Sequence, residues 1–191
     1  MARLVESASL TEFAALAQME LLRAEDISAY CMRLLEEDLD EGDALIAAFA
    51  GSRNPTSAEA GPAVSRILKL RGVRELSRNE ATLWALRLHL AVALANADIV
   101  EGLSPVIERF GTLDTERLVT HPRRAPDHPD ATYASEELGL EYIYGNFYAY
   151  DEIEFYRVPF EEQKALRARC LMNLRNGATE LHEHLSTVLG A

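Results

Sequence analysis

The chain has 191 residues, 48% of them hydrophobic, and a formal net charge of −12 at pH 7. This length and composition exclude a disordered or membrane-spanning chain and predict a single globular domain over residues 1–191. The excess of acids disfavours nucleic acid and anionic membranes as partners, because both are negatively charged. With no cleavable signal after Met1 and only two cysteines, a cytoplasmic location is expected.

The first part of the chain has the sequence pattern of a series of short helices. Ser9 and Glu12 have the spacing of a capping box, in which a hydroxyl and a carboxylate satisfy free amides at a helix start. Apolar residues at helical spacing follow this box, and two further runs with the same spacing come before Gly51. Three helices are therefore predicted, near residues 10–22, 27–35 and 40–50.

A central helix is predicted in the next part of the chain. A connection rich in Ser, Asn, Pro and Gly is expected over residues 52–61, before a fourth helix that ends at Gly72. A second capping box, Ser77 with Glu80, opens a helix over residues 80–97 that is apolar nearly all round. A helix without a polar face must be covered on most sides, so we expect it at the centre of the fold.

Helices separated by one long loop are predicted in the remainder of the chain. A helix that starts behind Asp98 and ends at Gly111 is expected to kink or restart at Pro105. Residues 120–134 hold three prolines and few hydrophobic residues, and are the best candidate for a long loop. Further helices are expected near residues 135–144, 151–157, 160–175 and 179–189, the last two separated by Gly177.

These patterns predict one fold class. No convincing run of alternating strand residues is present. The expected fold is therefore all-α, with about eight to nine helices stacked in pairs around the apolar helix at residues 80–97.

Acidic residues are concentrated in two stretches of the chain. Residues 20–43 hold nine acids and two bases, and residues 136–162 hold eight acids and one base. A solvated helix face explains either stretch taken alone. If the two stretches meet in space, they would suit a cationic partner.

The most informative stretch is the aromatic segment, residues 133–160, which holds nine of the chain's fourteen aromatic residues. Tyrosine combines an apolar ring with a hydroxyl that tolerates water, so it suits protein interfaces. Phe147, Phe155 and Phe160 are expected in the core. The predicted partner-binding residues combine tyrosines with carboxylates: Glu141, Tyr148, Tyr150, Asp151, Glu152, Glu154 and Tyr156. The alternative, in which the rings only cap the core, stays open.

Part of the aromatic segment resembles a known family. Residues 143–159 read Ile-Tyr-Gly-Asn-Phe-Tyr-Ala-Tyr-Asp-Glu-Ile-Glu-Phe-Tyr-Arg-Val-Pro. This run resembles the C-terminal signature of an uncharacterised bacterial family, domain of unknown function 2247. It departs from that signature at Tyr150, where the family tends to have proline. The resemblance implies a small helical bacterial protein and brings no activity with it.

No motif in the sequence indicates catalysis or metal binding. The five histidines lack the spacing of known zinc sites, and neither cysteine has a histidine nearby in sequence. We therefore predict no metal ion and no cofactor. The leading interpretation is a non-enzymatic, acidic helical protein that binds a cationic protein, such as an immunity-type inhibitor of a cationic toxin.

Two other functions remain open. One is an enzyme or small-molecule binder with a pocket between the central helix and the aromatic segment. Its lining residues would come from Trp84, Arg87, His89, Glu141 and Tyr144. The other is a homo-oligomeric structural protein, which would present a large apolar patch on an outer helix.

Overall fold

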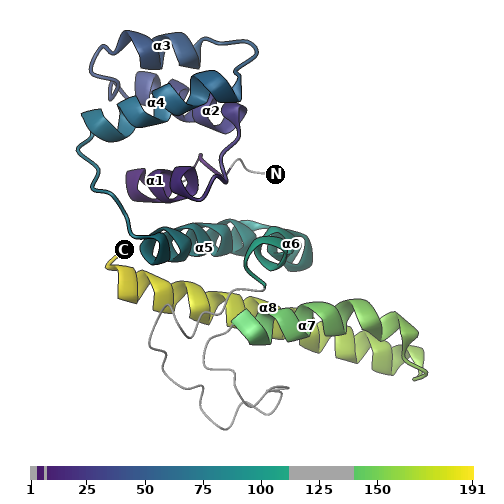
Figure 1. Cartoon of the computed structure of the whole chain (residues 1–191). Helices are drawn as coiled ribbons and strands as arrows, with labels where there is room; N and C mark the ends of the chain where they lie inside the picture. Colours follow the sequence, from purple (N-terminus) through teal and green to yellow (C-terminus); the bar gives the residue numbers. More distant parts are fainter. Residues whose placement is uncertain (1–3, 7, 112–139) are drawn as a thin grey trace. The chain divides into compact units, whose positions relative to one another are not determined.

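The computed structural model describes residues 4–6, 8–111 and 140–191. These residues form eight α-helices and one 3-10 turn and contain no strand, which confirms the all-α prediction (Figure 1). The predicted loop at residues 120–134 and the start of the aromatic segment lie outside the described residues.

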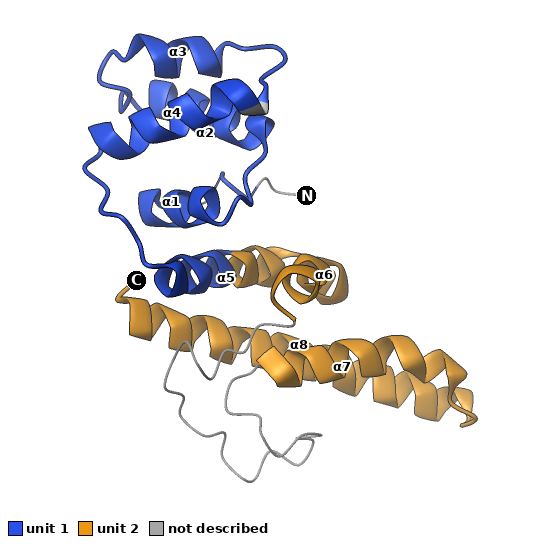
Figure 2. Cartoon of the chain, in the orientation of Figure 1, with its two compact units in different colours: residues 1–88 blue, residues 89–191 orange. Residues whose placement is uncertain are grey.

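The chain groups into two compact units, residues 1–88 and residues 89–191 (Figure 2). The boundary falls inside one continuous helix, α5 (Arg78–Ala95). The organisation of the chain as a single domain stays a prediction.

The first unit contains four helices and the first half of α5. These four are α1 (Leu10–Gln18), α2 (Ala24–Glu36), α3 (Ala44–Ala50) and α4 (Ser57–Leu70). Helices α2, α3 and α4 pack against one another (Figure 1). The apolar stripe predicted for α2 is buried at Ile27, Cys31 and Leu34, so α2 contributes one face to this core.

Both capping boxes predicted from the sequence are present. The Glu12 amide donates to Oγ of Ser9 at 3.3 Å, and the Ser9 amide donates to the Glu12 carboxylate at 2.8 Å. Ser77 and Glu80 form the same pair of bonds at the start of α5, at 3.2 and 2.9 Å. These bonds satisfy amides that the first turn of a helix leaves without a partner.

Three helix boundaries in this unit differ from the prediction. Helix α1 ends at Gln18 rather than near residue 22, and Glu20 takes a positive φ of 55°. Helix α3 begins only after Asp43, whose side chain accepts two amide hydrogen bonds. The predicted connection, residues 52–61, is too long. Thr56 and Glu59 form a further capping box, so α4 already begins at Ser57.

Helix α5 is covered on most sides, as its sequence predicts. Between Ala81 and Leu90, only Trp84 and Arg87 are half-buried and the remaining residues are buried. A helix with apolar residues on every side leaves no face that water can solvate well, so this burial follows from the sequence.

The second unit contains the end of α5, three further helices and a short turn. The elements are α6 (Ile99–Phe110), α7 (Leu140–Glu152), the 3-10 turn η2 (Ile153–Phe155) and α8 (Phe160–Leu189). Helices α7 and α8 lie side by side as an antiparallel hairpin joined by η2 (Figure 1). We call this pair the α7–α8 hairpin.

Helix α6 is continuous through Pro105, which excludes a restart there, and the predicted kink stays a prediction. Two predicted interruptions in this unit are wrong. Helix α7 continues through residues 145–150, which separate the helices predicted near 135–144 and 151–157. The two predicted terminal helices are one helix, α8, in which Gly177 is buried. Packing along the buried side of α8 outweighs the modest cost of glycine inside a helix, about 1 kcal/mol relative to alanine.

Candidate functional site

A buried polar contact fixes how the two helices of the α7–α8 hairpin meet. Nδ2 of Asn173 in α8 donates to Oδ1 of Asn146 in α7 at 3.0 Å. Nδ2 of Asn146 in turn donates to the carbonyl oxygen of Tyr142 at 2.9 Å. Both asparagines are more than nine-tenths buried, so this pairing favours the observed register of the two helices.

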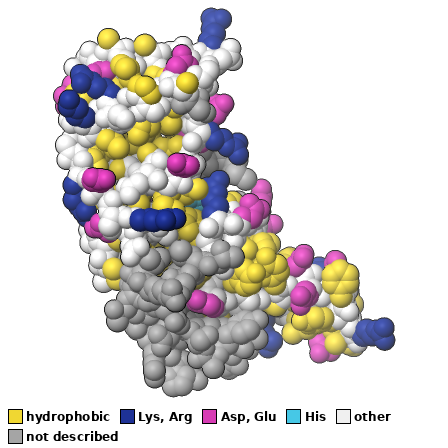
Figure 3. Space-filling model, viewed as in Figure 1, with side chains coloured by type: hydrophobic (Ala, Val, Ile, Leu, Met, Phe, Trp, Pro, Cys, Tyr) yellow, Lys and Arg dark blue, Asp and Glu magenta, His cyan; other side chains and the backbone are white. Residues whose placement is uncertain are grey.

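The closed end of this hairpin carries an exposed aromatic and acidic surface, which we call the hairpin tip. Its members are exposed residues from the end of α7, from η2 and from the start of α8: Asp151, Glu152, Glu154, Phe155, Tyr156, Phe160, Glu161 and Glu162. Figure 3 shows hydrophobic and acidic side chains next to one another over this end of the hairpin.

Two phenylalanines of the hairpin tip are strongly exposed, which contradicts their predicted place in the core. Phe155 and Phe160 are each 75% exposed, and Phe147 is half-buried. The reason is local: Ile153 is buried at 1% exposure and takes the inward position of η2, so Phe155 faces outward. Phe160 is the first residue of α8, ahead of the helix's buried face, which begins at Cys170.

The predicted partner-binding residues divide into two groups. Asp151, Glu152, Glu154 and Tyr156 are exposed and belong to the hairpin tip. Glu141 is half-buried in the first turn of α7, at the other end of that helix. The remaining members of the predicted set are tyrosines of α7, and their role in binding stays a prediction.

The tyrosines of α7 differ in their environments. Tyr148 is 43% exposed, and its ring centroid lies 4.5 Å from that of Tyr144. A side-chain hydrogen bond with Tyr144 raises the pKa of the Tyr148 hydroxyl. Tyr150 is half-buried, with the guanidinium of Arg167 5.7 Å from its ring centroid. Tyr150 therefore already has a cation beside it, while Tyr148 has a larger exposed area.

The charge of the hairpin tip is unbalanced. Residues 151–162 hold five carboxylates and one cation, Arg157. Within the part of the chain that the structure describes, none of these carboxylates forms an ion pair. Sequence reasoning missed four members of this surface: Phe155, Phe160, Glu161 and Glu162. The sequence does indicate this surface, because Pro159, which precedes the first residue of α8, has phenylalanines and carboxylates within a few residues on both sides.

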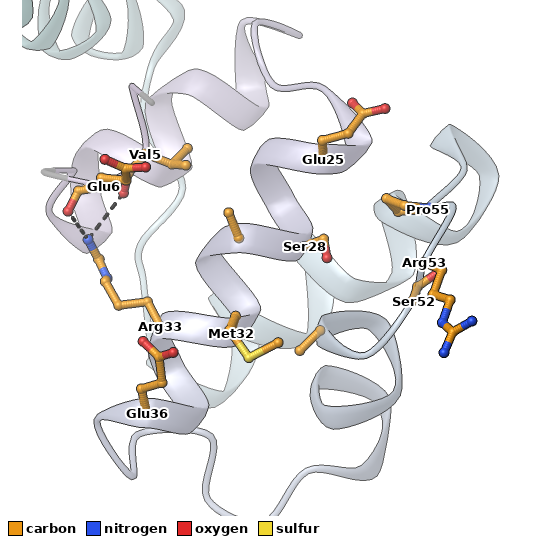
Figure 4. A pocket seen from close by; sticks show the side chains of 12 residues that line it. Val5, Glu6, Glu25, Ser28, Met32, Arg33, Glu36, Ser52, Arg53 and Pro55 are labelled. Atoms are coloured by element: carbon orange, nitrogen blue, oxygen red, sulfur yellow. Dashed lines mark hydrogen bonds between the residues drawn. The ribbon is translucent and has the colours of Figure 1, made fainter. Parts of the chain in front are cut away.

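A second surface feature is a groove in the first unit, lined by α2, by Val5 and Glu6, and by residues 50–55 (Figure 4). It has a volume of about 500 Å³. Glu25 and Glu36 lie at the two ends of its α2 side, and Met32 lies between them. We call this feature the α2 groove.

Three residues proposed to line the alternative small-molecule pocket have other contacts inside their own units. Arg87 forms an ion pair with the buried Glu12 and lies over the ring of Trp84, 5.5 Å from its centroid. Trp84 also packs against a small buried cluster that includes Leu76. Nη1 of Arg109 lies 2.7 Å from Nε2 of His89, which is buried. These contacts give the three residues a structural role, and the alternative pocket stays a prediction.

The described residues contain neither a metal-binding cluster nor a membrane-spanning helix. No group of three or more His, Cys, Asp or Glu side chains there is arranged to hold a metal ion. No described helix combines the length and the hydropathy needed to cross a bilayer.

Comparisons with family models, with curated proteins and with solved structures found no match to this chain. The resemblance of residues 143–159 to domain of unknown function 2247 therefore stays a prediction.

Proposed function

We propose that the chain is a binding protein whose hairpin tip engages a cationic protein. The observation that carries this proposal is the 75% exposure of Phe155 and of Phe160 beside five carboxylates that form no ion pair among the described residues. Large aromatic side chains are costly to leave in water, so an exposed group of them is typical of an interaction site.

The two kinds of side chain would make different contributions to binding. The rings of Phe155, Tyr156 and Phe160 would supply buried apolar area at the centre of an interface, where a few aromatic anchors carry most of the free energy. The surrounding carboxylates would speed association with a positively charged surface and disfavour acidic partners. An arginine of the partner could in addition stack on an exposed ring.

The narrower form of the proposal is an immunity-type inhibitor. A toxin that acts on nucleic acid presents a cationic site to phosphates, and the carboxylates of the hairpin tip would occupy such a site in their place. Co-production of the chain with its partner toxin would then restore growth. A Phe155→Ser, Phe160→Ser double variant would fail to restore it while accumulating to the same level.

The broader proposal is tested by quantitative capture. The full chain and the Phe155→Ser, Phe160→Ser variant are immobilised and exposed to lysate of the source cells, and bound proteins are identified by mass spectrometry. The matched control is Val188→Ser, since Val188 is also exposed but lies at the other end of α8.

The expected result is a basic protein that is retained by the wild type and by the control and is lost from the double variant. Equal retention of every protein by all three chains would refute the proposal. So would the loss of an acidic protein, rather than a basic one, from the double variant. High salt should reduce retention by the wild type, because exposed charge pairs are screened.

A further inference from the structure

Helix α2 has a second face, opposite the one that packs into the core, and this face forms one side of the α2 groove. Its residues recur at i, i+3, i+4, i+7, i+8 and i+11 along the helix: Glu25, Ser28, Ala29, Met32, Arg33 and Glu36. Eleven residues of α-helix rise by about 16 Å. The face is therefore long enough to lie along three turns of another helix.

The walls of the groove are held in place by hydrogen bonds. On one side, the guanidinium of Arg33 donates to the carbonyl oxygens of Val5, Glu6 and Ala8 at 3.1, 3.0 and 2.8 Å. On the other side, Oγ of Ser28 donates to the carbonyl oxygen of Phe49 at 3.3 Å. Because both walls are tied to α2, a ligand would find the groove already formed, which lowers the entropic cost of binding.

The middle of the groove is apolar and adaptable. Ala29 and Ala50 are small, so another backbone can approach closely, and Met32 is 42% exposed. Methionine has an unbranched, polarizable side chain that adjusts to differently shaped apolar groups. A leucine-sized side chain of a partner would fit against these three residues.

The charged groups around the groove favour a cation. Glu6, Glu25 and Glu36 are exposed and form no ion pair within the described residues. Arg33 keeps its positive charge but directs its guanidinium at the wall carbonyls, and Figure 4 shows the guanidinium of Arg53 directed away from α2.

Glu36 is notable because it lies in the last turn of α2. A negative charge there opposes the helix dipole, so the helix itself gains nothing from it. A positively charged group of a ligand at this end of the groove would be attracted to the Glu36 carboxylate.

From these observations we propose that the α2 groove binds a basic amphipathic helix of another protein. The partner helix would lie along α2, place an apolar side chain on Met32, and direct arginine or lysine side chains toward Glu25 and Glu36. This is the helix-in-groove mode of recognition, in which apolar anchors give affinity and flanking charges give orientation. It does not depend on the function proposed for the hairpin tip.

The test uses the full chain and two labelled peptides, with binding followed by fluorescence anisotropy. The basic peptide has leucines at helical spacing flanked by arginines, and the acidic peptide has glutamate in place of every arginine. Met32→Glu and the milder Met32→Gln remove the apolar contact. Glu36→Lys reverses a groove charge, and the matched control Glu75→Lys makes the same change elsewhere in the first unit.

The wild type should bind the basic peptide and not the acidic one, and both Met32 variants should lose this binding while keeping their helical circular dichroism. Glu36→Lys should weaken it by about fivefold, whereas Glu75→Lys should change it by less than about twofold.

Three results would overturn the proposal. The first is absence of binding to the wild type, and the second is an equal effect of Glu36→Lys and Glu75→Lys, which would indicate general attraction to an acidic chain. The third is a concentration-dependent dimer in sedimentation that Met32→Glu abolishes, because the groove would then be occupied by a second copy of the chain.

Discussion

Asn173 of α8 donates a hydrogen bond to Asn146 of α7 across the buried side of the hairpin, with 3.0 Å between Nδ2 and Oδ1. Substituting one partner would leave a buried amide without its hydrogen bond, whereas substituting both would remove the need for one. This asymmetry gives a direct way to measure how much the pair contributes to the hairpin.

Asn146→Leu alone should lower the free energy of unfolding by about 1–3 kcal/mol. The double variant Asn146→Leu, Asn173→Leu should recover part of that loss. The measurement is a double-mutant cycle, in which urea unfolding gives the free energy of unfolding of the wild type, both single variants and the double variant. Strictly additive losses would show that the two amides do not depend on each other.

The ion pair between Glu12 of α1 and Arg87 of α5 predicts a larger effect on stability. The Glu12 side chain is 4% exposed, and Arg87→Ala would leave its carboxylate buried beside Ser9 without a cation. We expect a loss of about 3 kcal/mol for Arg87→Ala in chemical denaturation. Glu12→Gln combined with Arg87→Met should be less destabilising than Arg87→Ala alone. A greater loss in the combined variant would contradict this explanation.

Acid should weaken the start of α5 through Glu80. A hydrogen bond from Arg74, together with those from Ser77, lowers the pKa of the Glu80 carboxyl from 4.5 to about 2. A carboxyl whose pKa is lower in the folded state stabilises the fold above its unfolded pKa and loses this contribution as the pH falls toward its folded pKa. The contribution of Glu80 should therefore decline between about pH 4.5 and about pH 2.

The measurement is urea unfolding at about pH 6 and about pH 3 for the wild type and Glu80→Gln. The wild type should lose more stability on acidification than the variant, since glutamine has no proton to gain. Equal losses in the two chains would show that Glu80 is not responsible.

Cys31 should resist chemical modification in the folded chain. Its side chain is fully buried, and this burial raises the pKa of the thiol to about 11. Because the thiolate is the reactive form, alkylation at neutral pH should occur only after unfolding. Mass spectrometry of tryptic peptides after iodoacetamide treatment, with and without urea, separates the two cases. Rapid labelling of Cys31 without denaturant would contradict the buried position.

The sequence predicted the helix starts better than the helix ends. Ser9, Ser77 and Asp98 begin helices as expected, since each of these caps is a local hydrogen bond between near neighbours in the chain. Gly177 was expected to separate two helices and Pro105 to kink or restart one, but neither residue ends its helix. Whether a helix continues through such a residue depends on packing against distant segments, which local patterns do not encode.

The sequence predicted which kinds of residue form the hairpin tip, but not which of them are exposed. The density of rings and carboxylates around Asp151 and Glu152 is visible in the sequence and led to a protein-binding surface. The exposure of Phe155 was not predictable from hydrophobicity, because the burial of Ile153 decides which side of η2 faces inward. The α2 groove was also missed, since its walls come from segments that are distant in sequence.

The central claim, that the hairpin tip binds a cationic protein, is tested most directly by photo-crosslinking in the source cells. A photoreactive phenylalanine analogue is placed at position 155 in one chain and at position 188 in another, both of which are exposed in the wild type. The account predicts a single crosslinked product from position 155, containing a protein with net positive charge, and none from position 188. No product from position 155, or the same products from both positions, would contradict it.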